Sequence, residues 1–386
     1  MKRLGILTGG GDVPGLNVVI KTVCKRAFAE SMEVVGLRKG WGGIVSVQPD
    51  DPESVATFTL PLDADSVRPI DRFGGTMLHS SRTNPGEMRE SDIPDHLDAS
   101  KWTANENGRR DLTDVVIANL EALGIDSLVV TGGDDTLGYA ARLHAAGFPV
   151  IGVPKTMDND VWGTDYCLGF STAITRSVDL IHQLRTPAGS HERISIIELF
   201  GRNSGATALY TGMLVGAHRT LVPEVPFDPE RVATFLAEDQ DCNPAHYAIC
   251  VVSEGAHPAG GDIFESGEED AYGHKKLGGI GAWLAREVRE RTGRETLEQK
   301  LAYLMRAGAP DSLDRMVGMA FGTMAFEALQ AGRSGLLTAV VEGQYRSVSL
   351  SEVRAGARPA KVEENYDSEQ YRPRLRGLEG RTMVFG

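Results

Sequence analysis

Near its start the chain reads Leu4-Gly5-Ile6-Leu7-Thr8-Gly9-Gly10-Gly11-Asp12, a short apolar run that ends in glycines and an aspartate. A stretch with helical apolar periodicity follows over residues 16–29. Because short apolar runs are typical of buried strands, the pattern predicts a strand, a glycine turn and a helix. Units of this kind build the parallel sheets of α/β proteins.

The same alternation continues along the chain. Predicted strands cover 127–130, 149–153, 194–199 and 246–252, and predicted helices cover 115–123, 137–146, 173–184, 206–215, 281–292 and 314–329. Short buried strands between helices favour mostly parallel sheets covered on both faces, and 386 residues suffice for two such domains. We therefore expect an α/β protein with two doubly wound, Rossmann-like domains. The acidic, glycine-rich stretch 262–274 is interpreted as a surface insertion, and the polar chain after Glu342 as a segment on the surface.

Composition narrows the class of protein. Hydrophobic residues make up 41% and charged residues 24%, which is ordinary for a globular protein, and the net charge of −13 argues against nucleic-acid binding. No apolar run approaches the ~20 residues that span a bilayer, and the first residues enter the predicted strand and not a signal peptide. The four cysteines form no C-x-x-C pair. We expect a cytoplasmic protein without a nucleic-acid or membrane partner.

Two polar blocks each follow a predicted strand. They are Thr131-Gly132-Gly133-Asp134-Asp135-Thr136 and Pro154-Lys155-Thr156-Met157-Asp158-Asn159-Asp160. The ligand crevice of such a sheet lies at the carboxyl ends of its strands, which is where both blocks stand. Glycines let backbone N–H groups approach phosphate oxygens, Asp134 can hold Mg²⁺, and Asp158 can accept a proton from a hydroxyl. The blocks together predict a phosphoryl-transfer centre.

Asp135 and Lys155 indicate which donor this centre uses. Asp135 directly follows the candidate metal ligand, where its carboxylate repels a long nucleotide polyphosphate. Lys155, from the other block, can hold a short one. The pair favours a short polyphosphate donor over a nucleotide.

Further blocks occur in a fixed order along the chain. They are Gly10-Gly11-Asp12-x-Pro14-Gly15-x-Asn17, Gly74-Gly75-Thr76 with Ser81-Arg82, Gly132-Gly133-Asp134, Thr156-x-Asp158-Asn159-Asp160 with Gly163-Thr164-Asp165, Glu192-Arg193-Ile194-Ser195, Gly201-Arg202 and Glu254-Gly255. In this order they resemble the phosphofructokinase family, from Gly9 to about Gly343. The resemblance implies a site between two domains. We assign the donor-binding domain to 1–169 plus 305–355, and the sugar-phosphate domain to 170–304 plus 356–386.

On the donor side, the resemblance implies a role for each matched residue. Asp158 is the base for the 1-hydroxyl of fructose 6-phosphate, Asp134 holds Mg²⁺, and Arg82 holds the transferred phosphoryl group. Gly10 and Gly11 offer N–H groups to the donor phosphates, and Thr156 adds a hydroxyl. In pyrophosphate-dependent members Asp and Lys occupy the positions of Asp135 and Lys155, where ATP-dependent members carry glycine.

On the sugar side, Arg193 and Arg306 are the candidates for the 6-phosphate, since a guanidinium fork suits phosphate oxygens. Glu254 and the groups around Gly201 and Arg202 are expected to meet the sugar hydroxyls. In the family the arginine matched by Arg193 reaches in from a neighbouring subunit, which implies a homodimer or homotetramer with shared sites.

One sugar-side position agrees with the expected donor: Tyr303 precedes Arg306 as in the Tyr-x-x-Arg of pyrophosphate-dependent branches. Other positions depart from the family pattern. Phe200 stands where a methionine usually precedes Gly-Arg. Leu297 replaces a further phosphate-binding arginine, so that this contact is lost or comes from Lys300. The acceptor is therefore left open between fructose 6-phosphate and a related sugar phosphate such as sedoheptulose 7-phosphate.

The expected activity is transfer of a phosphoryl group from pyrophosphate to fructose 6-phosphate, giving fructose 1,6-bisphosphate and phosphate reversibly, in glycolysis or its reverse. Two alternatives remain open. One is an ATP-dependent 6-phosphofructokinase of the same fold. The other is a non-catalytic subunit that senses a sugar phosphate. The presence of Asp134, Asp158 and Arg82 argues against this second alternative. Asp160 is interpreted equally as a structural or a catalytic residue.

Overall fold

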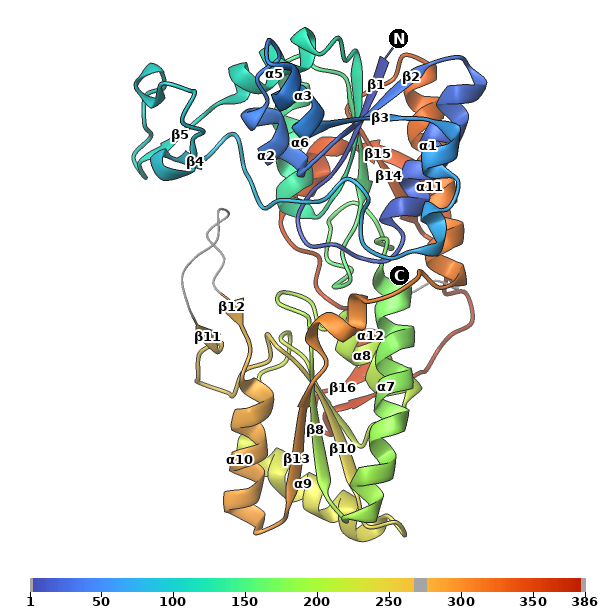
Figure 1. Ribbon diagram of the computed structural model, residues 1–386. Helices are drawn as coiled ribbons and strands as arrows, with labels where there is room; N and C mark the ends of the chain where they lie inside the picture. The colour runs from blue at the N-terminus through green and yellow to red at the C-terminus, as the bar shows by residue number, and fades with distance from the viewer. Residues whose placement is uncertain (1–2, 267–275, 383–386) are drawn as a thin grey trace.

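A seven-stranded sheet forms the upper part of the computed structural model, which describes residues 3–266 and 276–382 (Figure 1). In spatial order its strands are β15 (Gln344–Ser349), β14 (Leu336–Val341), β7 (Val150–Pro154), β6 (Ser127–Gly132), β1 (Arg3–Thr8), β2 (Glu33–Leu37) and β3 (Thr59–Leu62). The inner strands run parallel, and β3 and β15 are antiparallel at the two edges. The predicted, mostly parallel sheet is confirmed.

Helices cover both faces of this sheet because the strand side chains alternate between two cores. Leu4 and Ile6 belong to the core cluster that includes α1 and α11, whereas Leu7 belongs to the cluster that includes α5 and α6. The helices of this lobe are α1 (Leu16–Ala29), α2 (Gly40–Ser46), α3 (Pro52–Phe58), α4 (Ala64–Val67), α5 (Thr113–Ala122), α6 (Asp134–Ala145) and α11 (Ser312–Gln330). The carboxyl ends of β1, β6 and β7 point toward the second lobe, as Figure 1 shows.

The second lobe is built on a four-stranded, fully parallel sheet. Its strands, in spatial order, are β13 (Thr296–Lys300), β8 (Ile194–Leu199), β10 (Ala248–Ser253) and β9 (Arg219–Leu221). In Figure 1 the helices α7 (Phe170–Ser190) and α8 (Ala206–Leu214) lie on one side of this sheet, and α9 (Pro229–Cys242) and α10 (Ile280–Thr292) lie on the other. Two sheets covered on both faces are the expected doubly wound architecture.

The last part of the chain connects the two lobes. After β15 a short 3-10 helix, η5 (Leu350–Ala355), packs against α6. The chain then continues to α12 (Val362–Asn365) and to the small β-ladder of β16 (Tyr366–Asp367) and β17 (Arg372–Pro373). The Tyr366 hydroxyl donates to the carbonyl of Thr220 (2.5 Å), which fixes this end of the chain to β9 of the second lobe.

One sequence prediction differs from the structure. Residues 344–349, interpreted as a polar surface segment, form the edge strand β15, whose side chains are mostly exposed. An edge strand pairs on one side only, so that it carries no buried apolar pattern. Of the insertion predicted at 262–274, residues 267–274 lie outside the described residues. Among the helices that the structure describes, none is long and apolar enough to cross a membrane.

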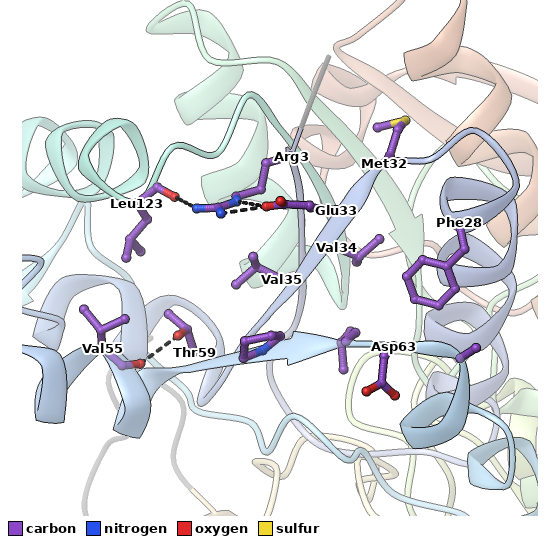
Figure 2. A pocket seen from close by; sticks show the side chains of 13 residues that line it. Arg3, Phe28, Met32, Glu33, Val34, Val35, Val55, Thr59, Asp63 and Leu123 are labelled. Atoms are coloured by element: carbon purple, nitrogen blue, oxygen red, sulfur yellow. Dashed lines mark hydrogen bonds and ion pairs between the residues drawn. The ribbon is translucent and has the colours of Figure 1, made fainter.

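A cavity of about 480 Å³ lies at the edge of the upper sheet (Figure 2). It is lined mainly by apolar side chains, among them Phe28, Met32 and Val34, and by the ion pair between Arg3 and Glu33, whose Nη2 and Oε2 are 2.6 Å apart. These last two residues stand at the amino ends of β1 and β2. The cavity is therefore at the end of the sheet opposite the predicted site.

Candidate active site

The first glycine turn of the site follows β1. The Gly9 N–H donates to the carbonyl of Thr131 (3.0 Å), which joins the turn to the end of β6. The Gly10 N–H donates to the carbonyl of Ser81 (3.0 Å). We expected both Gly10 and Gly11 to offer N–H groups to donor phosphates. Because the Gly10 N–H is already used, that expectation is corrected for Gly10 and is retained for Gly11.

The two adjacent carboxylates Asp134 and Asp135 form the first turn of α6. Gly133 precedes them at the N-cap, and all three residues line one cavity. The N-terminus of a helix presents N–H groups and a positive dipole, which stabilises carboxylates and phosphates placed there. This turn can therefore bind a donor phosphate directly or through a cation held by Asp134.

Lys155 follows β7 and is the buried cation of the site, with 4% of its surface exposed. Its backbone N–H donates to the carbonyl of Gly132 (2.9 Å), and its Nζ donates to the carbonyl of Gly11 (2.6 Å). Burial, with the nearby charge of Arg306, lowers the pKa of Lys155 to about 8. The ammonium group is thus held beside the first glycine turn and is still mostly protonated at neutral pH.

Asp158 lies two residues past Thr156, whose Oγ1 accepts the Asp158 backbone N–H (3.1 Å). The Asp158 Oδ2 accepts the backbone N–H of Arg202 (3.4 Å), while its Oδ1 is buried without a hydrogen-bond partner in the described part of the chain. Burial, and then the charge of Glu254, raises the pKa of Asp158 to about 7. An unpaired carboxylate oxygen with a pKa near neutrality is suited to accept a proton from a substrate.

Asp160 lies in the same loop and is buried, with 8% of its surface exposed. Burial and the neighbouring Asp158 raise the pKa of Asp160 well above its ordinary value. It lines the same cavity as Asp134 and Asp158. The structure thus brings a third carboxylate to the centre, and Asp160 is the N-cap of none of the described helices.

The sugar-side turn follows β8 and contains Phe200, Gly201 and Arg202. Gly201 has φ of 143°, and a Cβ atom at this position would lie 2.3 Å from the Ser253 Oγ. Only glycine fits here, because an L side chain would be strained and would overlap its neighbour. The turn directs the Arg202 backbone to Asp158, as described above, and places Arg202 in the wall of the cavity.

Glu254 follows β10 at the carboxyl end of the second sheet. It is buried, and burial raises its pKa. The Lys300 Nζ lies 2.6 Å from the Glu198 Oε1 and 3.8 Å from the Glu254 Oε2. The structure therefore places Lys300 between two buried carboxylates, where it partly offsets the cost of burying them.

Tyr303 and Arg306 lie in the 3-10 helix η4 (Ala302–Arg306). The Arg306 guanidinium lies over the Tyr303 ring at 4.7 Å and over the Phe200 ring at 5.9 Å, and its Nη2 is 3.6 Å from the Asp12 Oδ1. Tyr303 is 67% exposed. The two rings hold the guanidinium at the junction of the lobes.

Arg193 is the one predicted site residue that the structure places elsewhere. It directly precedes β8, and its backbone N–H donates to the carbonyl of Ala188 (2.9 Å). Phe200 follows the other end of this six-residue strand. Since a strand rises about 3.3 Å per residue, roughly 20 Å separate Arg193 from the sugar-side turn of its own chain. Arg193 is therefore not part of the site formed within one chain.

The predicted donor-side and catalytic residues, together with Arg202, line one small cavity of about 170 Å³. Its lining comes from both lobes: Gly10, Gly11, Arg82, Gly133, Asp134, Asp135, Thr136, Lys155, Thr156, Asp158, Asp160, Arg202 and Asn203. An adjoining cavity of about 410 Å³ shares Gly10, Gly11 and Arg82 with it. Arg82 thus belongs to the walls of both spaces, where a group passing between them can be contacted.

Some cavity residues were not assigned a site role from the sequence. Asn203 lines the smaller cavity, and Asp12 and His79 line the larger one. Asp12 lies within the first glycine block, so that its position could have indicated a role. His79 has φ of 60° and stands in a turn between Thr76 and Arg82. Nothing in its sequence context indicated that it would face the site.

Comparison with known proteins agrees with this geometry. The family model described as "Phosphofructokinase" matches residues 3–329. The pyrophosphate--fructose 6-phosphate 1-phosphotransferase of Amycolatopsis methanolica is 38% identical over 371 residues, covering 96% of this chain and 99% of the relative. The ATP-dependent 6-phosphofructokinase 3 of Streptomyces coelicolor is also 38% identical, over 91% of this chain and 94% of the relative. The chain belongs to the phosphofructokinase family.

Solved structures agree on the fold. The pyrophosphate-dependent phosphofructokinase from Marinobacter aquaeolei superimposes with a TM-score of 0.75 over 100% of this chain and 96% of that one, at 20% identity. At this level of identity the likeness concerns the fold alone. It confirms the two-lobed α/β architecture.

Proposed function

We propose that the protein transfers a phosphoryl group from pyrophosphate to the 1-hydroxyl of fructose 6-phosphate, giving fructose 1,6-bisphosphate and phosphate. The observation that carries this proposal is the pair Asp135 and Lys155 in the wall of a 170 Å³ cavity. That volume is below the ~300 Å³ at which pockets for drug-sized ligands begin, and it suits a small anion. Relatives named for pyrophosphate support the same donor.

The charges of the cavity also favour a short donor. Lys155 is held toward Gly11, so that its ammonium can bind the outer phosphate of pyrophosphate. The Asp135 carboxylate occupies the first turn of α6, where the next phosphate of a nucleotide would otherwise gain from the helix dipole. A lysine that attracts the short donor and a carboxylate that repels the long one give specificity by both attraction and repulsion.

In the proposed reaction, the Asp158 Oδ1 takes the proton of the 1-hydroxyl as the sugar oxygen attacks the phosphorus atom. The bond from phosphorus to the bridging oxygen of pyrophosphate breaks, and phosphate leaves. Lys155 and Arg82 stabilise the negative charge that is redistributed over the phosphoryl oxygens. The raised pKa of Asp158 matches this proton transfer near neutral pH.

Enzymes of this family generally use a divalent metal, and the residues of the site fit Mg²⁺. Among residues 3–266 and 276–382 no three His, Cys, Asp or Glu side chains form a preformed metal cluster. Mg²⁺ is ordinarily bound by one or two carboxylates together with substrate phosphates and water. We propose that Asp134 supplies the protein ligand. When bound, the ion neutralises charge on the donor phosphates.

The proposed enzyme is a homodimer or homotetramer in which Arg193 completes the sugar site of a neighbouring chain. The position of Arg193 at the far end of β8 supports this proposal, since the residue cannot serve the site of its own chain. We further propose that the lobes are the domains 1–169 plus 305–355 and 170–304 plus 356–386. The strands of the first sheet come from 3–154 and 336–349, and those of the second from 194–300.

ATP is the alternative donor, because an ATP-dependent relative is as similar as the pyrophosphate-dependent ones. In the deciding experiment, purified protein is incubated with Mg²⁺, fructose 6-phosphate and either pyrophosphate or ATP. The fructose 1,6-bisphosphate formed with each donor is measured. We expect turnover with pyrophosphate. Turnover with ATP alone would contradict the donor assignment and leave the family assignment intact. Sedoheptulose 7-phosphate in place of fructose 6-phosphate tests the breadth of the acceptor.

A further inference from the structure

The loop that carries Asp158 is irregular and needs external support. Residues 158–165 form no helix and no strand beyond isolated bridges. Asn159, directly after the proposed base, has φ of 55°, a left-handed conformation that costs free energy in any residue other than glycine. A strained, irregular segment keeps one conformation only where its surroundings hold it there.

Within the loop, Asn159 supplies part of that support. Its Nδ2 donates to the carbonyl of Asp165 (3.0 Å), and its Oδ1 accepts the backbone N–H of Cys167 (2.8 Å). The Asp165 N–H donates in turn to the carbonyl of Val340 in β14 (2.7 Å). These bonds fold the loop back toward the first sheet.

A second support comes from residues 357–360, which we call the strap. They follow η5 and cross the loop from outside. Ala357 forms an antiparallel bridge with Val161, and the Arg358 N–H donates to the carbonyl of Asp160 (2.7 Å). The strap therefore pairs with the loop by its backbone, at positions two and three residues after Asp158.

The Arg358 side chain reinforces this pairing. Its Nη2 donates to the carbonyl of Asp165 (2.9 Å) and to that of Asn159 (3.4 Å), and its Nη1 lies 3.4 Å from the Asp165 Oδ1. One guanidinium thus joins the beginning of the loop to its end. Both partners are largely buried, with side-chain exposures of 17% for Arg358 and 21% for Asp165, so that water screens the ion pair only in part.

The strap also reaches the sugar-side turn. The Ala360 N–H donates to the Glu224 Oε1 (2.7 Å), and the same carboxylate accepts the Gly205 N–H (2.9 Å). Gly205 begins α8 directly after the turn that contains Arg202. The four-residue strap therefore contacts the base loop at one end and the start of α8, next to the sugar-side turn, at the other.

We propose that Arg358 is a positioning residue, which holds the 158–165 loop so that the Asp158 carboxylate meets the acceptor hydroxyl. No strap residue lines the 170 Å³ cavity, as far as the described residues show, so that Arg358 acts through the loop and not on the substrate. The proposal rests on the proposed role of Asp158 and hence on the proposed function. Misplacing a reacting group by about 1 Å can lower turnover by about 100-fold.

The test compares Arg358→Ala with the control Arg354→Ala, an exposed arginine in η5 that directly precedes the strap. Turnover is measured with the donor that supports the wild-type protein. For Arg358→Ala we expect kcat to fall about 30- to 100-fold, with KM for donor and sugar phosphate changed less than about threefold. Added guanidinium should restore part of kcat. Arg354→Ala should resemble the wild type.

Hydrogen exchange gives a readout that does not depend on activity. Peptides covering 158–167 should exchange at least about tenfold faster in Arg358→Ala, while peptides of β6 keep their wild-type rates. If Arg358→Ala does not fold, Arg358→Lys, which retains one cation, should show intermediate kcat and intermediate loop exchange.

If loop exchange in Arg358→Ala is unchanged, Arg358 is merely structural. The same conclusion follows if kcat of Arg358→Ala lies within twofold of the wild type although its melting temperature is lower. Equal losses of kcat and of substrate affinity would also overturn the proposal. Absence of turnover in the wild type with either donor would instead contradict the proposed function, and the exchange data would still decide whether Arg358 holds the loop.

Discussion

The donor side and the sugar side of the site are built in different ways. The donor side consists of the ends of three adjacent strands, β1, β6 and β7, joined by backbone hydrogen bonds such as that from Gly9 to Thr131. The sugar side consists of side chains from turns and from η4, and its phosphate-binding candidate Arg193 lies at the wrong end of β8 for its own chain. The donor half is formed within a single chain, whereas the sugar half in the proposed assembly needs Arg193 of a second chain.

This difference shows what each half depends on. Backbone groups at strand ends are positioned by the sheet itself, so that the donor half is rigid once the first lobe has folded. The sugar half depends on packing between Phe200, Tyr303 and Arg306 and, in the proposed assembly, on a neighbouring chain. We therefore expect changes on the donor side to affect the chemical step, and changes on the sugar side to affect sugar affinity and to depend on assembly.

The largest effect is expected at the junction of the two halves. Asp158→Asn should lower kcat by about 100- to 10,000-fold, because an amide cannot accept the proton of the hydroxyl. Sugar and donor binding, measured by calorimetry, should change little. Asp95→Asn, an exposed aspartate in the same lobe, serves as the control. Turnover close to that of the wild type would remove Asp158 from the mechanism.

The next effect concerns the donor side alone. The double change Asp135→Gly with Lys155→Gly should lower kcat/KM for pyrophosphate by about 100-fold or more, since it removes a buried charge that contacts the donor. KM for fructose 6-phosphate should remain within about threefold of the wild type. The same changes at the exposed Asp95 and Lys101 are the control. An unaltered preference for pyrophosphate over ATP would show that this pair does not select the donor.

A smaller effect is expected on the sugar side. Arg193→Ala should raise KM for the sugar phosphate about 10- to 100-fold, because it removes a charged hydrogen bond to the 6-phosphate. KM for pyrophosphate should be unchanged. Mixing this variant with inactive Asp158→Asn chains, after subunit exchange, should restore part of the activity, because a hybrid site takes Asp158 from one chain and Arg193 from the other. No recovery in assemblies shown to contain both chains would place Arg193 outside the neighbour's site.

The smallest effect is on stability and follows from the pKa of Asp158. Burial raises this pKa from about 3.9 in the unfolded chain to about 7 in the fold. The folded state therefore binds more protons between these values, and the stability of the wild type falls as pH rises from about 4 to about 7. The Asp158→Asn variant, which has no titrating group at this position, does not lose this stability as the pH rises. Its melting temperature, measured without metal or substrate, should exceed that of the wild type by several degrees at pH 8, since each pKa unit corresponds to about 1.4 kcal/mol.

At pH 5 the two melting temperatures should lie closer together, with the gap narrowing further toward pH 4. Asp95→Asn, whose carboxylate is exposed, should show no pH-dependent difference from the wild type. A difference between Asp158→Asn and the wild type that is the same at pH 5 and pH 8 would show that the Asp158 carboxylate ionises in the fold as it does in the unfolded chain.

In both lobes, the elements with a buried apolar face were predictable from sequence. The helix at Leu16–Ala29 and the strand at Ile194–Leu199 have the predicted bounds, because buried strands and amphipathic helices carry strong apolar patterns. The edge strand β15 was missed, since its side chains are mostly exposed and show no such pattern. Asp158 and Lys155 could be found because they follow strands. Two contacts could not be predicted, because they depend on tertiary structure that no local pattern encodes. One is the hydrogen bond that occupies the Gly10 N–H, and the other is the contact of Arg358 with a loop almost two hundred residues earlier.

The six-residue length of β8 has one more consequence. If Arg193 serves a neighbour, this strand has one end in each of two active sites, and it is hydrogen-bonded on both sides to β10 and β13. This pairing restrains the strand along its whole length. Any displacement along its axis when sugar binds at one end would shift the phosphate-binding arginine at the other, so that occupancy of one site would be transmitted mechanically to the next.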